Sequence, residues 1–402
     1  MILYKVKENN KQMKKHKIRY GGAMIGDEEV NAIIKTINKD RGNWQQGEEG
    51  AKMEEEAAKF LGVKYGILTN SGSSAGLLAL SALELPKSSE VIISACTFPT
   101  IFNIIIQCGL IPVVVDAKIG TYTFDVDEVE KAISKKTKAI IAIHPVGNPV
   151  DMPRLMKVAH KHKIKVIEDG CDTWGGSING KMLGSFGDIS ITSFHAAHIV
   201  SMGVGGGIFT NNKELAQNVR MYRDWGRQSN TDRPHNVKTL PKDYNPRFVY
   251  DKMGYNFQIL ELQAAMGRIQ LRKADKIRKL RKTNFDYLYK HLGKYPMILP
   301  KSVDGADICW FAFPLTYDGD RGKLVAHLEK NGIETRSMFA GNITRHPAYK
   351  NVKYRIGSKL DDANYILSHS FWIGVHPRMD QKDREYVVKI FDDFFKEKTG
   401  NE

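Results

Sequence analysis

Short apolar runs alternate with amphipathic stretches between about residues 64 and 210 of the chain. The runs are rich in Val, Ile and Thr, which is typical of buried strands, whereas stretches such as 76–83 and 153–162 indicate helices. A strand, a crossover helix and a further strand, repeated this often, predict an α/β fold with a mainly parallel sheet between two layers of helices. The predicted strands are 65–69, 91–94, 111–115, 139–143, 165–168, 188–192 and 207–210.

The remaining segments predict an arm and a second, smaller domain. Residues 1–20 are polar and rich in lysine, which favours a flexible arm. Apolar residues at helical spacing predict an amphipathic helix over 27–37. From about residue 284 the pattern changes to a helix at 286–292, a strand at 310–316 and a helix at 322–331. We therefore expect a basic arm (1–20), a large domain (21–283) and a small C-terminal α+β domain (284–402).

The composition is that of an ordinary globular protein. Hydrophobic residues make up 42% of the 402 positions and charged residues 26%. The most apolar stretch, 101–115, contains Asn103, Gln107 and Pro112 and is shorter than the ~18 apolar residues of a membrane span. The N-terminus lacks an apolar signal core, so we expect a cytoplasmic protein with no membrane partner. The four cysteines are scattered, which predicts neither a disulfide framework nor a metal site.

The formal net charge of +15 leaves several interpretations open. Basic residues gather between Lys5 and Arg19, and again between Arg272 and Lys282 on a predicted helix. Such runs are usually solvated faces. Aromatic residues are not interleaved with them as in many nucleic-acid sites, so we expect no nucleic-acid partner. A cationic surplus would also attract a substrate that contains a diphosphate.

Two turns that follow predicted strands are candidates for binding a ligand. Residues 69–76 are small and precede a helix, so Gly72 and Ser73 could cradle a phosphate at the helix N-terminus; an ordinary capped turn is the alternative. Phe98 follows the strand at 91–94 and could stack on a pyridine ring, with a core phenylalanine as the alternative. Ligands of parallel sheets bind beyond the carboxyl ends of the strands, where we expect both turns.

Two further candidates lie at 168–172 and 254–258. Glu168 and Asp169 close an apolar strand, where carboxylates are costly unless something pairs with them. Asp169 could keep a pyridine nitrogen protonated, which makes a pyridoxal ring an electron sink. Metal binding or helix capping are the alternatives. Asn256 precedes the helix expected at 259–270 and is free to donate a hydrogen bond, with helix capping again the alternative.

His198 occupies a position at which a lysine would be expected. The stretch S-F-H-A-A-H that ends at His198, together with three glycines at 205–207, is similar to the cofactor-anchoring stretch S-F-x-x-x-K of sugar aminotransferases that use pyridoxal phosphate. An imidazole cannot form the lysine's covalent bond to the cofactor, but it can move protons near neutral pH. This exchange favours elimination over amino transfer, and His195 is the rival base.

The order and spacing of these motifs resemble the DegT/DnrJ/EryC1/StrS family, pyridoxal-phosphate enzymes of nucleotide-sugar metabolism. The resemblance runs from about residue 20 to residue 395 and implies the three-layer αβα architecture of fold type I, the fold of aspartate aminotransferase. It depends on S-G-S-S-A at 71–75, T-F-P-T at 97–100, E-D at 168–169, S-F at 193–194, G-Y-N at 254–256 and Q-A-A at 263–265.

The resemblance, applied position by position, implies a role for each candidate residue. It assigns the proton transfers to His198 and implies a homodimer in which the two subunits share their active sites. The implied cofactor-binding residues are Gly72, Ser73 and Ser193 at the phosphate, Phe98 on the face of the ring, Asp169 at the ring nitrogen, Asp172 beside the ring, and Asn256 at the phosphate of the neighbouring subunit.

Within the family, the chain is similar to the branch without the lysine, the NDP-4-keto-6-deoxyhexose 3-dehydratases. The shared stretches are D-x-C-D at 169–172, S-F-x-x-A-H with M-G-x-G-G at 193–206, R-D-W-G-R at 223–227, F-A-G-N-I-T-R at 339–345 and F-W-I-G-V at 371–375. One type in this branch has a [2Fe-2S] cluster, acts on CDP-sugars and needs a reductase. Its cluster cysteines follow R-D-W-G-R, whereas 228–233 contain none here, and Cys171 alone cannot supply four ligands. The cluster-free GDP-4-keto-6-deoxymannose 3-dehydratases match better, so we expect no reductase partner.

The resemblance implies C3 dehydration of a nucleotide-linked 4-keto-6-deoxyhexose toward a 3,6-dideoxy sugar of the O-antigen type. Pyridoxamine phosphate, regenerated with glutamate, would condense with the C4 ketone; His198 would remove a proton from the cofactor, and the C3 hydroxyl would leave. Ile199 and Val204 depart from the family pattern. The alternatives are a CDP-4-keto-6-deoxyglucose 3-dehydratase, a non-catalytic sugar-nucleotide sensor and a sugar aminotransferase, the last disfavoured because no lysine lies between Lys181 and Lys213.

Overall fold

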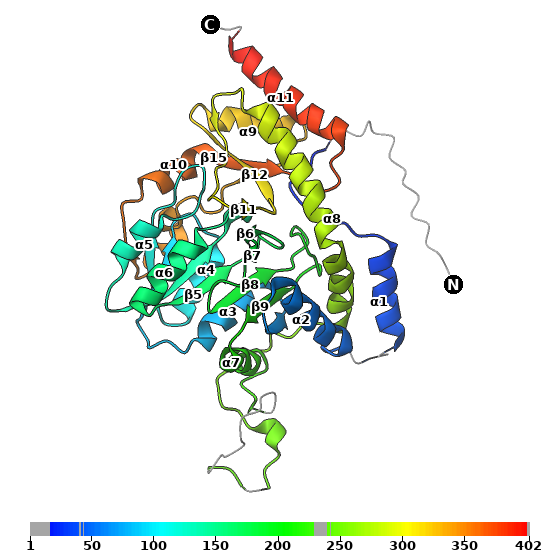
Figure 1. Ribbon diagram of the computed structural model, residues 1–402, viewed down its shortest axis with the longest axis vertical. Helices are drawn as coiled ribbons and strands as arrows, with labels where there is room; N and C mark the ends of the chain where they lie inside the picture. The colour runs from blue at the N-terminus through cyan, green and yellow to red at the C-terminus, as the bar shows by residue number, and fades with distance from the viewer. Residues whose placement is uncertain (1–16, 40–41, 43, 229–238, 242, 400–402) are drawn as a thin grey trace.

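The computed structural model describes residues 17–39, 42, 44–228, 239–241 and 243–399, and its centre is an eight-stranded sheet (Figure 1). The strand order is β1-β9-β8-β5-β4-β2-β3-β14. β9 runs antiparallel to both of its neighbours, and the other pairs are parallel. The strands are β1 Tyr65–Thr69, β2 Glu90–Ser94, β3 Ile111–Val115, β4 Thr137–Ile143, β5 Lys165–Asp169, β8 Ile189–Ser193, β9 Gly206–Thr210 and β14 Arg355–Ile356.

Helices cover both faces of this sheet because successive strand residues point to opposite sides. Ile141 packs into the cluster formed with α3, α4 and α7, whereas its neighbour Ile140 packs with α5 and α6. α2 and α8 bury Leu68 of β1 and Phe209 of β9. The helices are α2 Glu48–Leu61, α3 Gly72–Ala82, α4 Pro99–Gln107, α5 Val126–Ala132, α6 Met152–His162, α7 Lys213–Arg223 and α8 Glu261–Leu292.

The C-terminal part builds a second, antiparallel sheet in the order β10-β12-β15-β13. Its core is aromatic, and the rings of Phe285 and Trp310 stack with centroids 4.2 Å apart. Figure 1 shows this layer with α9 and α11 at one end of the long helix α8. The elements are β10 Met297–Ile298, β12 Ala312–Tyr317, α9 Arg321–Lys330, β13 Thr335–Ser337, α10 Asp361–His369, β15 Ser370–Gly374 and α11 Gln381–Thr399; a small sheet contains β11 Ala306–Asp307, β6 Ser177–Ile178 and β7 Lys181–Met182.

All eight strands predicted from the sequence are confirmed, seven in the large sheet and 310–316 as β12, but the helix expected at 286–292 is not a separate element. The helix expected at 286–292 is the last two turns of α8, which continues without a break from Glu261 to Leu292. A boundary between 283 and 284 therefore falls inside a helix. β14, which comes from the C-terminal part, also pairs with β3 of the large sheet. The division into domains stays a prediction.

The last residues of the expected arm are held in place, which corrects the prediction of flexibility for 17–20. Ile18 is 2% exposed and forms backbone hydrogen bonds to Gly332 and Glu334 at 2.8 and 2.9 Å. The backbone N–H of Tyr20 donates to the carboxylate of Glu334 at 3.1 Å. The first 16 residues of the expected arm lie outside the described residues.

α1 (Asp27–Lys39) confirms the helix expected over 27–37, but the side that faces the protein is polar. Glu29 is fully buried and accepts hydrogen bonds from Gln270 and Lys273, both at 2.7 Å. Val30 and Ile34 point outward and are 47% and 50% exposed. The exposed apolar side chains of this helix therefore have no covering partner among the described residues of one chain.

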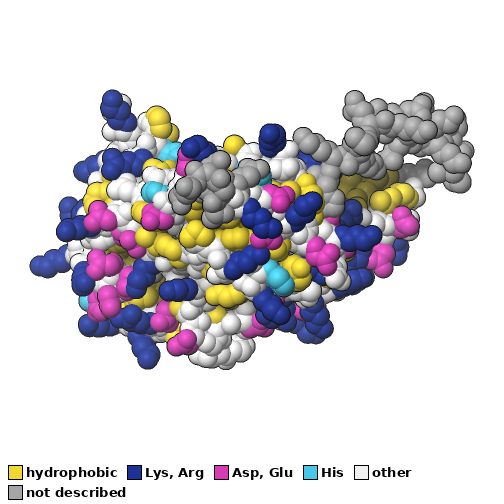
Figure 2. Space-filling model, turned by 90° about the horizontal axis from the view of Figure 1, so that it is seen from above, with side chains coloured by type: hydrophobic (Ala, Val, Ile, Leu, Met, Phe, Trp, Pro, Cys, Tyr) yellow, Lys and Arg dark blue, Asp and Glu magenta, His cyan; other side chains and the backbone are white. Residues whose placement is uncertain are grey.

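Charges of both signs are distributed over the surface. Figure 2 shows one face on which lysine and arginine side chains are interspersed with acidic and apolar ones. In the described ranges, no helix is both long and apolar enough to cross a membrane.

His376 gives the fold a predictable response to acid. Its Nδ1 accepts from the N–H of Arg378, so in the neutral ring Nε2 holds the proton and donates to the carbonyl of Gly22 at 2.8 Å. Burial, together with the positive charge of Arg281, lowers the pKa of His376 to about 4. A histidine with a lowered folded-state pKa contributes stability above its unfolded pKa of about 6.5, and this contribution is lost as the pH falls toward 4.

We expect His376→Gln to reduce this acid sensitivity. Between pH 7 and pH 4.5, wild type should lose ~2 kcal/mol more free energy of unfolding than the variant, measured by urea unfolding at both pH values. His162→Gln is the control, because His162 lies at the surface beside Glu130. Equal losses in wild type and His376→Gln would contradict the assignment.

Candidate active site

A cavity of about 740 Å³ opens where several strands of the large sheet end. It is lined by residues that follow β1, β2, β4, β5 and β8, and on the other side by Phe311, Arg336 and Trp372 from the C-terminal part. These strands are mutually parallel, so their carboxyl ends meet at one edge, the usual ligand position in such sheets. The volume suits a small-molecule ligand.

The N-terminus of α3 forms one end of the cavity. Ser71 caps the helix by accepting from the N–H of Ser74 at 3.0 Å, and the Ser73 hydroxyl contacts that of Thr100 at 2.9 Å. A Cβ on Gly72 would lie 2.8 Å from the Cβ of Ser193, so only glycine allows this close approach. Free N–H groups and the helix dipole make such an end a site for a phosphate.

The structure shows why position 206, one of the three glycines noted in the sequence, requires a glycine. A Cβ at this position of β9 would lie 2.3 Å from the carbonyl oxygen of Ser71. The strand can therefore pass directly behind the turn that opens α3, and this contact fixes the turn.

Asp169 and Phe98 lie in the same cavity and suit an aromatic nitrogen base. Asp169 is 7% exposed and accepts from the N–H of Cys171 at 3.2 Å. Burial raises the pKa of its carboxyl, and the neighbouring Asp172 raises it further. No lysine or arginine among the described residues forms an ion pair with Asp169, so a protonated ring nitrogen would supply the missing positive charge. Phe98 is 56% exposed and offers a bare ring face.

His198 lies beside Asp172 in the cavity wall. Its Nε2 is 3.3 Å from Oδ1 of Asp172, and the other carboxylate oxygen accepts from the N–H of Val146 at 3.0 Å. Nδ1 is buried and has no hydrogen-bond partner among the described residues. Nε2 is therefore the nitrogen that can reach a ligand.

His195, the rival base, also lines the cavity, but no carboxylate of the described residues forms an ion pair with it. Its ring lies 6.0 Å from that of His198, and its Nδ1 accepts from the N–H of Ala197 at 3.3 Å. Burial lowers the pKa of His195, and the His198 ring lowers it further. This geometry favours His198 for the proton transfers.

Glu168 stabilises the fold and does not line the cavity, unlike its neighbour Asp169. It is fully buried and accepts from the backbone N–H groups of Gly184, Phe186 and Gly187 at 2.8, 2.5 and 2.7 Å. Glu168 therefore fixes the turn at 184–187, which is not a helix, so its role differs from both alternatives that the sequence offered, metal binding and helix capping. In the described part of the chain, no three His, Cys, Asp or Glu side chains form a group that could hold a metal ion.

Asn256 is the one candidate that the structure does not bring to this cavity. It is exposed, and its backbone pairs with that of Asp224 in an isolated bridge. A role at the cofactor of a neighbouring subunit stays a prediction.

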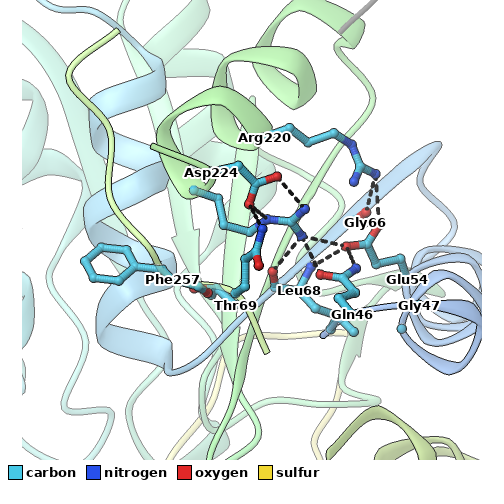
Figure 3. A network of polar contacts seen from close by, with 12 residues as sticks. Gln46, Gly47, Glu54, Gly66, Leu68, Thr69, Arg220, Asp224 and Phe257 are labelled. Carbon is cyan, nitrogen blue, oxygen red and sulfur yellow. Dashed lines mark hydrogen bonds and ion pairs between the residues drawn. The ribbon is translucent and has the colours of Figure 1, made fainter. Parts of the chain in front are cut away.

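A buried ion network holds the segment that contains Asn256 (Figure 3). The guanidinium of Arg223 donates to Asp224 at 2.9 Å, to Glu54 at 3.1 Å and to the carbonyl of Leu68 at 3.1 Å. Gln258 donates to the same Asp224 carboxylate at 2.9 Å. The R-D-W-G-R stretch is thus fastened to β1, at the strand end that leads to the turn before α3.

Several cavity residues were missed in the sequence. His144 follows β4, and the rule that ligands bind at strand ends would have found it. Tyr20 and Arg336 gave no local signal: the guanidinium of Arg336 lies 3.9 Å from the centroid of the Tyr20 ring, although the two are far apart in the chain. Only the folded chain brings them to the cavity.

The amino-acid sequence is similar to those of known proteins. The pattern of the DegT/DnrJ/EryC1/StrS aminotransferase family matches residues 24–392. The lipopolysaccharide biosynthesis protein RfbH of Salmonella typhimurium is 37% identical over 93% of this chain and 91% of its own length. A dTDP-4-dehydro-2,6-dideoxy-D-glucose 3-dehydratase of Saccharopolyspora spinosa is 36% identical over 94% and 86%. A GDP-4-keto-6-deoxy-D-mannose 3-dehydratase of Yersinia pseudotuberculosis is 31% identical over 87% and 92%.

Solved structures agree in fold. A crystal structure of GDP-4-keto-6-deoxymannose-3-dehydratase with a trapped PLP-glutamate geminal diamine aligns with a TM-score of 0.87 and 26% identity, covering 93% of this chain and 100% of that one. A mutant of that enzyme with bound GDP-perosamine aligns with a TM-score of 0.86, the same identity and the same coverage. The predicted fold class is therefore confirmed.

Proposed function

The chain belongs to the DegT/DnrJ/EryC1/StrS aminotransferase family, and on this premise we propose that it is a pyridoxal-phosphate-dependent enzyme that removes the 3-hydroxyl of a nucleotide-linked 4-keto-6-deoxy sugar. The single observation that supports this most is His198, paired with Asp172 in the cavity wall at the position where a lysine would anchor the cofactor. No lysine is among the described residues that line the cavity. Two of the relatives and both of the solved structures described above are named as sugar 3-dehydratases.

Different residues of the cavity would bind different parts of the cofactor. Bound cofactor supplies a ring that withdraws electrons from the reacting atoms. Gly72, Ser73 and Ser193 would hold its phosphate at the N-terminus of α3. Phe98 would cover one face of the ring, and Asp169 would hold the proton on its nitrogen. These residues fit the cofactor in shape and in charge.

His198, assisted by Asp172, would carry out the proton transfers. Nε2 of His198 would take up a proton in the first half of the reaction and deliver it to the departing hydroxyl in the second. Asp172 stabilises the charged imidazole from 3.3 Å. Such acid–base assistance contributes on the order of 10²–10⁴ in rate.

We propose GDP-4-keto-6-deoxymannose as the substrate and glutamate as the amino donor that regenerates the cofactor. The solved dehydratase structures with PLP-glutamate and with GDP-perosamine support both. The sequence contains four cysteines, and none lies in the stretch after R-D-W-G-R, which supports a reaction without a cluster or a reductase. A dTDP-linked sugar is the second candidate, because the Saccharopolyspora spinosa relative is 36% identical over 94% of the chain.

One assay tests the reaction and the nucleotide together. The purified protein is incubated with pyridoxal phosphate, glutamate and a panel of GDP-, CDP- and dTDP-linked 4-keto-6-deoxy sugars, and the products are weighed. Dehydration gives a sugar that lacks one oxygen, together with equal amounts of 2-oxoglutarate and ammonia. A sugar that keeps the glutamate nitrogen would identify an aminotransferase instead, and no turnover with any sugar would favour a sensor.

We also propose that the enzyme is a homodimer whose interface includes the apolar face of α1. Val30, Ile34 and Ile37 lie exposed on this helix, and Leu260 is 50% exposed at the start of α8. Exposed apolar groups of this kind mark interfaces between subunits. Asn256 could then contribute to a neighbouring active site.

Ile34→Glu should weaken the dimer at least about tenfold, because the interface would bury an unpaired carboxylate. Sedimentation over a range of protein concentrations measures the change. Ile356→Glu on the edge strand β14 is the control, since Ile356 is 47% exposed and lies away from α1. If Ile34→Glu associates as wild type does, α1 is not in the interface.

A further inference from the structure

Arg281 is a cation buried in the wall behind the candidate active site. It lies on α8 and is 0% exposed, and none of the described carboxylates forms an ion pair with it. Its Nε is buried and finds no hydrogen-bond partner in the part of the chain that the structure describes. Burial lowers the pKa of its guanidinium, against the opposing influence of Cys309 and Asp172. A buried charge without an ion-pair partner reduces the stability of the fold, so we expect Arg281 to serve a purpose other than stability.

The two hydrogen bonds of Arg281 go to backbone carbonyls of two segments that meet at His198. Nη1 donates to the carbonyl of Phe311 at 2.6 Å, and Nη2 donates to the carbonyl of Ala197 at 3.4 Å. Ala197 is the residue before His198, and the Phe311 ring lies 5.4 Å from the imidazole. One guanidinium therefore joins the segment that contains the histidine to the segment that packs against it.

Further contacts link Phe311 back to His198, so that the interactions form a closed circuit. The N–H of Phe311 donates to the carbonyl of Val146 at 2.9 Å, and the N–H of Val146 donates to Oδ2 of Asp172 at 3.0 Å. Oδ1 of Asp172 is 3.3 Å from Nε2 of His198. Val146 has a φ of 49°, a strained value for a β-branched residue that only surrounding contacts can maintain.

We propose that Arg281 is a positioning residue for His198: its planar fork fixes the carbonyl of the residue before His198 and the carbonyl of Phe311, whose ring packs against the imidazole, and so holds Nε2 at Asp172 and toward the substrate. This inference depends on the proposed function of His198 as the proton-transferring group. Arginine suits the task because its donors have a rigid geometry, which a lysine ammonium lacks.

Two variants and a matched control test the proposal. Arg281→Met removes the charge and both hydrogen bonds at similar volume, and Arg281→Lys keeps the charge but can reach only one carbonyl. We expect kcat to fall about 10- to 100-fold in Arg281→Met and less in Arg281→Lys, with KM for the sugar within about twofold of wild type, because misplacing a reacting group lowers the rate steeply. Arg278→Met, on the same helix and ion-paired with Asp307, should keep the wild-type kcat.

A second measurement does not depend on turnover. In protein with ¹⁵N-labelled histidine and no cofactor, His198 is identified by the ring signals that disappear in His198→Asn. Wild type and Arg278→Met should give one sharp set of these signals, whereas the Arg281 variants should give broadened or split signals because the ring samples several orientations. If Arg281→Met does not fold, Arg281→Lys decides the question with the same measurements.

The proposal is overturned if the Arg281 variants keep the wild-type kcat and one sharp set of ring signals, or if only KM changes. Full activity and a single set of signals in Arg281→Lys would also overturn it, because charge alone would then suffice. If wild type fails to dehydrate any sugar while the Arg281 variants still split the signals, the proposed function fails and the positioning role stands.

Discussion

Replacement of His198 by asparagine should lower the rate of C3 dehydration by about 10²–10⁴, the usual contribution of general acid–base catalysis. Asparagine is similar in size and can still hydrogen-bond to Asp172, but it cannot take up a proton near neutral pH. The residues that would hold the cofactor, including Asp169 and Phe98, are untouched by the change. We therefore expect kcat to fall while cofactor affinity, measured by its absorbance during titration, stays near that of wild type.

His195→Asn is the matched control, because this residue lines the same cavity and has no ion pair with a carboxylate among the residues described. It should keep kcat within about tenfold of wild type, well above His198→Asn. Full dehydration by His198→Asn, or a larger loss in His195→Asn, would transfer the role of base to His195.

His198→Lys separates the two chemistries of the family. A lysine at this position can bond covalently to the cofactor aldehyde, as the lysine of the aminotransferases does. The variant should therefore retain cofactor through dialysis and lose dehydration. Retention no better than that of wild type would show that position 198 is out of reach of the cofactor.

The sequence was sufficient for the fold and for most of the cavity because both depend on local patterns. Each strand of the large sheet except β14 is an apolar run of ordinary length, and the turns with Gly72 and Asp169 follow such runs directly. In a parallel sheet the ends of successive strands meet, so residues distant in the chain could be grouped in advance.

The rest could not be predicted because it depends on contacts between distant segments. Arg281 belongs to a basic run that the sequence presents as a solvated face, yet its side chain is fully buried. α1 has a regular apolar stripe, but the fold buries Glu29 against Gln270 and Lys273 instead. A periodic pattern predicts that a helix forms, not which of its faces meets the same chain.

Asp169→Asn should have opposite effects on cofactor binding and on the stability of the cofactor-free protein. Loss of the charge opposite the ring nitrogen should weaken cofactor affinity about 30- to 3,000-fold, the range for truncating one partner of a buried charged pair. Without cofactor, the buried carboxylate is a cost. Its pKa is raised by burial, so the charged form is disfavoured in the folded state at any pH above the unfolded value of about 3.8.

The cofactor-free Asp169→Asn protein should therefore unfold at a higher temperature than wild type at neutral pH. This difference should shrink as the pH falls through the raised pKa of Asp169, because wild type then neutralises the same group by protonation. Thermal unfolding of both proteins at several pH values measures the effect. A lower unfolding temperature for the variant at neutral pH would mean that Asp169 stabilises the fold and is not reserved for a ligand.

Glu168→Gln is the decisive comparison, because the two carboxylates are adjacent on β5 and both are buried. Glu168 already accepts three backbone N–H groups, so an amide there would place its own donors against them. Loss of these charge-assisted hydrogen bonds should destabilise the protein by about 2–4 kcal/mol while folded molecules bind cofactor normally. Asp169→Asn should raise the unfolding temperature of the cofactor-free protein, and Glu168→Gln should lower it. Opposite shifts would show that Glu168 stabilises the fold and that Asp169 is reserved for binding the cofactor.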